Sequence, residues 1–374
     1  MTVERRTDVT NRYINRNLVP SISAVDLFCG AGGLTNGLQT EGINVVAGFD
    51  IEESCRFPYE HNNDSTFFNK DVSELESEFV RSLYPEGHIK LLAGCAPCQP
   101  FSSYSQGKDV ANDRRWPLLY AFSRLIREVE PELVTMENVP DVTKHQVYDD
   151  FVNELNQLGY HVWGQKVYCP DYGLPQQRKR HVLVASRLGP IELSPPSHRP
   201  EEYVSVESVI GHLPPIEAGK KNDDDPLHRS ANLSPLNQKR IRHSIPGGTW
   251  KDWPQSLVAK CHRKKSGKNY AGVYARMSPD KPAPTMTTQC YGYGNGRFGH
   301  YDINQNRAIS IREAAIIQTF PDDYEFLSDP ENISLIHLGK LIGNAVPVKL
   351  AQVIGKTLYE HTTDVLCQRS NDVA

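Results

Sequence analysis

The sequence predicts an α/β protein with a mostly parallel β-sheet and helices on both faces of the sheet. Short β-branched and apolar runs alternate with amphipathic helical segments through the first half of the chain, which is the pattern of a sheet with crossover helices. The chain has 374 residues, of which 39% are hydrophobic and 23% are charged. These values fit one large core with a smaller lobe, and they exclude collagen-like, coiled-coil and wholly disordered chains.

The predicted strands are short runs that end at glycine, proline or polar residues. In chain order they cover residues 22–28, 43–49, 67–68, 89–93, 133–136, 161–168 and 181–185. The predicted helices carry apolar residues on one face or a start or stop residue at one end. They cover residues 34–41, 52–61, about 118–129 and about 151–158. Strand and helix therefore alternate up to about residue 190.

Beyond Pro190 the chain becomes rich in proline, glycine and charge, and regular periodicity returns only at Ser310. Ser310 and Glu313 have the spacing of a capping box, which predicts a helix to about Gln318. A last helix is predicted with Pro347 near its first turn. We therefore predict four parts: a loose arm at 1–20, a main domain at 21–190 plus 308–362, a second lobe at 191–307 and a C-terminal tail at 363–374.

Two absences in the sequence predict a cytoplasmic protein. No run of 18 apolar residues is present, so no transmembrane helix is expected. The N-terminus lacks the apolar stretch of a secretory signal. The eight cysteines are too sparse for a disulfide scaffold, and we expect most of them to be reduced.

The formal net charge of −4 conceals a basic region. Residues 176–275 contain 17 Lys and Arg against 9 Asp and Glu, and the remainder contains 24 against 36. Basic side chains that meet phosphates release condensed counterions, so this region could bind a polyanion. The alternative is a solvated, charged lobe without a partner.

A glycine-rich segment follows the first predicted strand and precedes the first predicted helix. Its sequence from Phe28 to Gly33 is FCGAGG, and small residues there allow backbone N–H groups to approach a ligand closely. Asp50 ends the second strand and is placed to accept hydrogen bonds from ribose hydroxyls. Asp71 follows the third strand and could receive an adenine amino group. Together these signals favour a cofactor that contains adenosine, although each Asp could instead be a helix N-cap or turn residue.

A Cys-x-x-Cys pair follows the buried strand at 89–93. Cys95 and Cys98 lie in the segment GCAPCQPFS. Zinc would need a second ligand pair at comparable spacing, and none is present. A thiol-redox pair would open a helix, whereas a long polar stretch follows Pro100. A single nucleophilic cysteine is the sharper hypothesis, and its site should hold positive charge or oriented N–H groups; a buried, inert cysteine is the alternative.

Charged residues also flank two later strands. Glu137 ends the strand at 133–136, and a carboxyl there can act as an acid when a dry pocket favours its protonated form. Arg178 and Arg180 precede the strand at 181–185. Because they are two residues apart in an extended segment, they point to the same side and could both meet a carboxylate, a phosphate or a base carbonyl.

Taken together, these motifs resemble the DNA (cytosine-5)-methyltransferase family of bacterial restriction–modification systems. The resemblance covers about residues 21–359, and it rests on the order of six segments: AVDLFCGAGG, GCAPCQPFS, ENV, QQRKR, RMSPDKPAPT and GNAVP. It implies a Rossmann-like methyltransferase sheet that uses S-adenosylmethionine and no metal. It also implies that the lobe at 191–307 is a target-recognition domain, and that the main domain is catalytic and binds the cofactor.

The resemblance assigns roles residue by residue. The cofactor would be lined by Phe28, Gly30, Gly32, Gly33, Asp50 at the ribose, Ile51, Asp71 at the adenine and Asn344. The catalytic residues would be Cys98 as the nucleophile, Glu137 holding the base, and Arg178 and Arg180 buttressing the site, with Cys95 left as an incidental neighbour. The DNA-binding residues would be Ser102, Gln106, Arg240, Arg242, Arg263, Lys264, Lys265 and Arg276, the last of which would also help to dock the small domain.

The family's chemistry explains these residue types. A thiolate that adds to C6 of cytosine turns C5 into a carbon able to attack a methyl group. A cytosine stacked in duplex DNA cannot reach such a pocket, so the base must be flipped out. The polar loop at 102–115, with Gly107 as a hinge, is the candidate lid over it.

Other functions remain open at this point. A relative that methylates cytosine in tRNA and an inactive DNA-binding relative are the alternatives; the size of the lobe favours duplex DNA, and the intact Cys98, Glu137 and Arg178 favour activity. Methylation of an exocyclic amino group is disfavoured because its Pro-Pro-aromatic motif is absent. The expected state is a monomer on duplex DNA, without a membrane partner, alongside a possible restriction endonuclease for the same DNA site.

Overall fold

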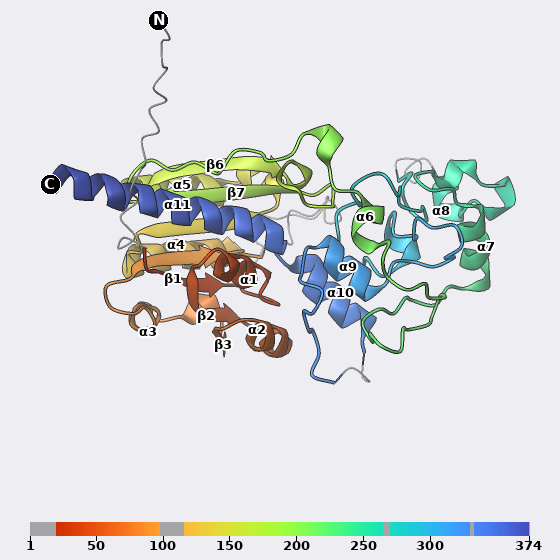
Figure 1. Cartoon of the computed structure of the whole chain (residues 1–374), viewed down its shortest axis with the longest axis horizontal. Helices are drawn as coiled ribbons and strands as arrows, with labels where there is room; N and C mark the ends of the chain where they lie inside the picture. Colours follow the sequence, from red (N-terminus) through yellow and green to blue (C-terminus); the bar gives the residue numbers. More distant parts are fainter. Residues whose placement is uncertain (1–19, 98–115, 265–269, 330–332, 374) are drawn as a thin grey trace, which may run out of the picture.

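The structure is a computed structural model that describes residues 20–97, 116–264, 270–329 and 333–373. An α/β domain occupies one end of the molecule, and the helices α6 to α10 gather at the other end (Figure 1). The long helix α11 runs from the junction between the two parts along the α/β domain (Figure 1). Among the described residues, no helix is long and apolar enough to cross a lipid bilayer.

A seven-stranded sheet forms the α/β domain, in the order β3-β2-β1-β4-β5-β7-β6. The strands are β1 Ile22–Leu27, β2 Asn44–Asp50, β3 Thr66–Asn69, β4 Ile89–Gly94, β5 Leu133–Asn138, β6 His161–Tyr168 and β7 Lys179–Ser186. The neighbours from β3 to β5 pair in parallel, whereas β7 is antiparallel to both β5 and β6. The mostly parallel sheet predicted from the sequence is therefore confirmed.

Helices cover both faces of the sheet, as predicted. On one face, α1 (Gly33–Thr40) and α11 (Val348–Val373) pack over apolar residues of β1, β2 and β4. On the other face, α4 (Trp116–Val129) and α5 (Gln146–Gln157) bury side chains that include Phe122, Leu125 and Phe151. The remaining helices are α2 Arg56–Asn62, α3 Ser77–Ser82, α6 Val206–Ile210, α7 Pro235–His243, α8 Lys260–Arg263, α9 Ile311–Ile317 and α10 Leu335–Asn344.

Short 3₁₀ helices fill several of the connections. They are η1 Glu53–Cys55, η2 Val72–Glu74, η4 Pro140–Lys144, η5 Cys169–Tyr172, η6 Pro200–Glu202, η7 Trp250–Asp252, η8 Gln255–Leu257 and η10 Tyr293–Asn295. The helix predicted at 52–61 is divided accordingly, because η1 comes first and α2 follows it. The capping box predicted at α9 is present, since Ser310 and Glu313 bond reciprocally to each other's backbone N–H groups.

Two expectations about helices were wrong. The second lobe contains α7, where no helix was predicted; Ser234 accepts a hydrogen bond from the backbone of Asn237, and Pro235 occupies the first turn. A Ser-Pro pair is a recognisable helix start, but the nine residues of α7 lack an apolar stripe. The predicted C-terminal tail at 363–374 is helical through residue 373, because α11 has no glycine or proline to end it there.

The two parts of the molecule share one apolar core. It joins Tyr59 and Phe67 of the α/β domain to Met277 and Phe298 of the second lobe, which covers residues 191–307 and is called the small lobe below. The same core also includes residues of helices α9 and α10. A buried ion pair lies beside this core. Arg307 bonds to both oxygens of Glu313, with Nη2···Oε1 at 2.6 Å and Nη1···Oε2 at 2.8 Å. Burial alone would raise the pKa of Glu313, but the charges and hydrogen bonds of Arg307 and His300 hold it far below its ordinary range.

We predict that Glu313→Gln lowers the free energy of unfolding by about 3–5 kcal/mol, because Arg307 is then buried without a counter-charge. Urea denaturation measures the change. The matched control is Glu360→Gln on α11, where both members of the Lys356–Glu360 pair are more than half exposed; its loss should be below about 0.5 kcal/mol. Equal losses in the two variants would contradict the importance of the buried pair.

Candidate active site

The predicted site residues gather at one edge of the sheet. The carboxyl ends of parallel strands lie at the same edge of a sheet. The strand order reverses between the neighbours β1 and β4, because β2 and β3 follow on one side of this pair and β5 to β7 on the other. Open α/β sheets bind their ligands in the crevice at such a switch point. The glycine segment after β1, Asp50 on β2, Asp71 after β3 and Glu137 on β5 all lie at this edge.

The glycine segment makes a tight turn from β1 into α1. Phe28, Gly30 and Gly32 all have positive φ angles, of 60°, 52° and 88°. A Cβ on Gly33 would come within 2.3 Å of the backbone oxygen of Val346, and one on Gly32 within 2.6 Å of the Asn63 side chain. A larger residue at 33 would therefore push the loop away from Val346, and one at 32 would displace the side chains of Asn63 and Tyr324. This close packing brings the part of the chain that holds Asn344, whose side chain is exposed, next to the glycine turn.

Asp50 organises the turn through its carboxylate. Oδ2 accepts a hydrogen bond from the Gly30 backbone at 2.9 Å, and Oδ1 accepts one from the Glu52 backbone at 2.9 Å. Burial is the main cause of a raised pKa for Asp50. The next residue, Ile51, is 67% exposed and presents an apolar face to solvent. Asp71 caps η2 by accepting two hydrogen bonds from Ser73 on Oδ1.

Asp26 was not singled out in the sequence, yet it lies directly beneath the glycine turn. It is completely buried on β1, and its Oδ2 accepts a hydrogen bond from Thr35 Oγ1 at 2.8 Å. Its other oxygen has no hydrogen-bond partner within the part of the chain that the structure describes. Burial raises the pKa of Asp26 to about 7. In the sequence, the signal that could have identified Asp26 is that it is the one acidic residue in the mostly apolar strand β1.

Glu137 is the centre of the second half of the site. It is buried at the end of β5, and its Oε1 lies 2.7 Å from Nε of Arg180 on β7. Its Oε2 accepts a hydrogen bond from the Cys95 thiol at 3.0 Å. Cys95, which the sequence left as an incidental neighbour of Cys98, therefore contacts Glu137 directly. Cys95 directly follows β4, and because β4 and β5 pair in parallel, the residues at their ends are adjacent.

The two arginines do not share one anion, contrary to the expectation from their spacing. Arg180 meets Glu137, whereas Arg178 is buried and donates to backbone carbonyls: 2.9 Å to Met286, 3.4 Å to Gly343 and 3.5 Å to Ala345. Burial, followed by the charge of Arg180, lowers the pKa of Arg178 to about 9. Arg178 lies just before β7, and its side chain connects this strand to the small lobe and to the end of α10.

Several predicted residues lie outside the described residues: Cys98, Ser102, Gln106 and Lys265, together with the proposed lid at 102–115. Burial raises the pKa of four other cysteines, to about 12 for Cys55, Cys169 and Cys290 and well above the ordinary value for Cys29. These thiols are poor nucleophiles. No group of three or more His, Cys, Asp or Glu that could hold a metal ion occurs within the described ranges.

The predicted DNA-binding residues that the structure describes divide into an exposed group and a buried group. Arg242, Arg263 and Lys264 are exposed on the small lobe. Arg240 is only 9% exposed; it donates to the backbone of Leu257 and stacks on Tyr274. Arg276 is 1% exposed and is held by backbone and side-chain oxygens of Ile241, Ser244, His300, Asp302, Gln305 and Asn306. These contacts place Arg240 and Arg276 inside the small lobe rather than on a DNA-facing surface.

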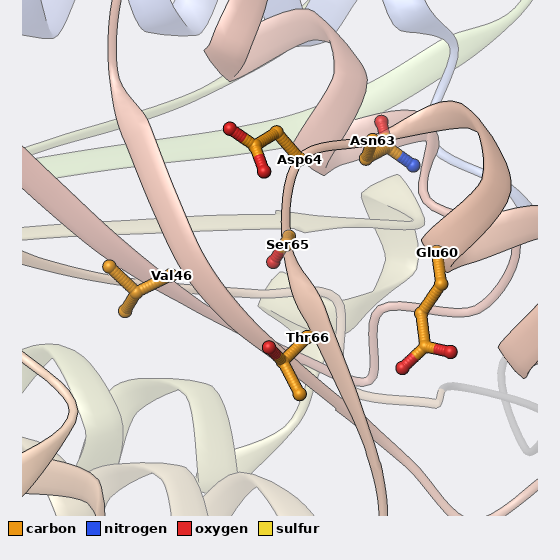
Figure 2. A pocket seen from close by; sticks show the side chains of 6 residues that line it. All are labelled: Val46, Glu60, Asn63, Asp64, Ser65 and Thr66. Atoms are coloured by element: carbon orange, nitrogen blue, oxygen red, sulfur yellow. The ribbon is translucent and has the colours of Figure 1, made fainter.

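A hollow of about 450 Å³ lies elsewhere, beside α2 and β3 (Figure 2). Its lining residues are Val46, Glu60, Asn63, Asp64, Ser65 and Thr66. Figure 2 shows the carboxylates of Glu60 and Asp64 pointing in different directions. Glu60 accepts hydrogen bonds from Arg56 and from the Phe67 backbone, so it serves the local fold. None of the predicted site residues lines this hollow.

Comparisons of the sequence with known proteins agree on one family. The model of the C-5 cytosine-specific DNA methylases matches residues 22–360. The Type II methylase M.HgiDII of Herpetosiphon aurantiacus is 50% identical over 339 residues, which cover 90% of this chain and 94% of that protein. The Type II methyltransferase M1.HphI of Haemophilus parahaemolyticus is 31% identical over 350 residues, which cover 92% and 88%.

Solved structures agree on the fold. A putative DNA modification methyltransferase encoded within an E. coli prophage has a TM-score of 0.66 at 21% identity, covering 91% of this chain and 99% of its own. The Dnmt2 methyltransferase of S. pombe has a TM-score of 0.56 at 17% identity, covering 90% and 97%. These similarities confirm the fold class predicted from the sequence.

We predict that Asp26→Asn stabilises the protein at pH 8 but has little effect at pH 4. Above a pH of about 7 the wild-type fold must hold a buried carboxylate, so its stability falls as pH rises from the ordinary Asp value of roughly 3.9 towards 7. The advantage of the variant should therefore grow with pH, to at most about 4 kcal/mol. Urea denaturation at both pH values measures it, with Asp64→Asn, an exposed residue, as the control. A difference that does not change with pH would refute the burial argument.

Proposed function

The chain belongs to the C-5 cytosine-specific DNA methylase family, and on that premise we propose that it methylates C5 of a cytosine flipped out of a specific duplex DNA sequence, with S-adenosylmethionine as the donor. The observation that carries this proposal is the position of the buried Glu137–Arg180 pair. It lies at the same sheet edge as the glycine turn and Asp50, so a base and a cofactor could meet there.

The residues around the glycine turn fit S-adenosylmethionine. Gly32 and Gly33 leave no room for side chains, so the backbone after Phe28 can lie against the methionine part. The Asp50 carboxylate already accepts two backbone hydrogen bonds and retains acceptor sites for ribose hydroxyls. Ile51 offers apolar surface to an adenine ring, Asp71 Oδ2 can accept from its amino group, and Asn344 would close the pocket. When bound, the cofactor supplies an electrophilic methyl group.

The proposed nucleophile is Cys98. Its thiolate adds to C6 of the flipped cytosine and forms a carbon–sulfur bond, while the electron pair of the C5–C6 double bond becomes available at C5. C5 takes the methyl group as the sulfur–methyl bond of the donor breaks, which leaves S-adenosylhomocysteine as the product, and a base, which could be water, removes the C5 proton. The electron pair left at C5 restores the double bond, and the thiolate departs. Burial raises the pKa of Cys29, Cys55, Cys169 and Cys290, which disfavours these four thiols as the nucleophile.

Glu137 would hold the base during these steps. In its protonated form it can donate to N3 of cytosine, and it can accept from the N4 amino group, which stabilises the charge that develops on addition. Arg180 lies against Glu137 and would keep its carboxyl group oriented. Arg178 would buttress the site indirectly, because its bonds to Met286 and Gly343 hold the small lobe and α10 against β7.

DNA would approach the basic small lobe. The exposed Arg242, Arg263 and Lys264 are suited to phosphate contacts, with Ser102, Gln106 and Lys265 proposed from the sequence alone. Arg276 and Arg240 would shape the lobe from within. The names of the relatives support a Type II modification role, paired with an endonuclease that acts on the same DNA site. Activity on tRNA is the alternative that the size of the lobe disfavours.

We predict that Cys98→Ser abolishes methyl transfer and leaves S-adenosylmethionine binding nearly intact, because a serine hydroxyl is not ionised at neutral pH. Incorporation of labelled methyl groups into duplex DNA and into tRNA measures both the activity and the substrate class, and Cys367→Ser on α11 is the control. Wild-type protein should also form a stable adduct with duplexes that carry 5-fluorocytosine at the target site. Substantial turnover by Cys98→Ser, or no adduct with wild type, would refute the covalent mechanism.

We also predict that the surface arginines determine the salt dependence of DNA affinity. Each phosphate contact that is lost should reduce the slope of log K against log salt by about 1. Arg242→Ala and Arg263→Ala should therefore bind DNA more weakly at low salt and with a flatter slope. Fluorescence anisotropy across a salt series measures this, with Lys356→Ala on α11 as the control. Slopes equal to that of wild type would remove these arginines from the DNA surface.

A further inference from the structure

We propose that Cys95 is a positioning residue for methyl transfer, acting through its hydrogen bond to Glu137. The Cys95 thiol donates to Glu137 Oε2 at 3.0 Å, and Arg180 Nε meets Oε1 from the other side at 2.7 Å. The carboxyl group is thus held by a hydrogen bond on Oε2 and by an ion pair on Oε1, which has no hydrogen-bond partner among the described residues. This inference rests on the proposed function, because Glu137 matters only if it binds the target base.

The thiol is fixed in place by its backbone. The N–H of Cys95 donates to the carbonyl of Leu27 on β1 at 3.2 Å, and the Asn138 side chain donates to the carbonyl of Ala96 at 3.3 Å. The segment after β4 is therefore fastened to the strands on both sides of it. Because the backbone cannot move freely, the sulfur atom stays beside the end of β5, where Glu137 lies.

A carboxyl group that must bind two atoms of a cytosine needs a defined rotation about its last side-chain bond, a torsion that is otherwise soft. Arg180 alone would restrain one oxygen. With the thiol on the second oxygen, the plane of the carboxyl group is restrained as well. Each oxygen keeps a second lone pair for the substrate, so the two donors orient Glu137 without occupying it fully.

The geometry gives Cys95 a task that differs from the nucleophilic role proposed for Cys98 from the sequence. The Cys95 S–H group donates a hydrogen bond to the Glu137 carboxylate; a thiol that acts as a donor carries its proton, and a neutral thiol is a poor nucleophile.

The test measures single-turnover methyl transfer by full-length protein on duplex DNA across a pH series. Cys95→Ala should be slower by about tenfold, the lower end of the range for a hydrogen bond to a charged group because a thiol is a weak donor, with DNA affinity unchanged. Cys95→Ser should recover most of the rate, because its hydroxyl can donate in place of the thiol.

Controls separate this inference from the proposed function and from simple misfolding. Cys367→Ala on α11 should match wild type, and melting temperatures show whether each variant is folded. If wild type methylates and Glu137→Gln is slow, but Cys95→Ala matches wild type at every pH, the role of Cys95 is overturned and the function stands. A folded Cys95→Ser that is as slow as Glu137→Gln also overturns it, even if Cys95→Ala fails to fold. If wild type transfers no methyl group to cytosine, the proposed function itself fails.

Discussion

Five strands that run in parallel and end at one edge of the sheet are the constraint on which the rest of the structure depends. Residues that are far apart in the chain meet there because each directly follows or ends a strand. Asp50 and Gly30 come together across β1 and β2, and Glu137 and Cys95 across β4 and β5. The antiparallel β7 enters the same edge from the opposite direction, which brings Arg180 to Glu137. The sheet therefore assembles both halves of the candidate site.

Buried guanidinium groups have a similar organising effect in the small lobe, which has little regular structure. Arg276 gathers carbonyl oxygens from two separate loops, and Arg307 joins the lobe to the start of α9 through Glu313. Arg178 connects β7 to the segment at Met286 and to the end of α10. Arg276 and Arg178 each use several donors to bind backbone oxygens, whereas Arg307 pairs with a buried carboxylate. The lobe is thus held at a definite place beside the sheet edge.

Burial also explains which sequence-based interpretations failed. Arg240 was assigned to DNA binding because it lies in the basic lobe, and Arg276 because of the family resemblance, but both are enclosed by the aromatic and carbonyl groups of the lobe. Arg178 and Arg180 were expected to be able to meet the same anion, yet their environments differ because only Arg180 lies within β7, where it pairs with Glu137. Cys95 was set aside because the family motif selects Cys98, and its contact with Glu137 depends on the pairing of β4 with β5. Helix α7 was missed because its only clear signal is the Ser-Pro pair at its start.

The sequence by itself determined the alternation of strands and helices, the glycine turn, the acidic residues at the ends of strands and the order of motifs that indicates the family. These are local properties, set by periodicity, chain reversal and the chemistry of single side chains. Only the tertiary structure decided which charges are buried, which arginine meets Glu137 and which thiol donates to it. Those contacts join residues from strands that are not consecutive in the chain, so they depend on the strand order of the sheet and on the packing of the small lobe against its edge.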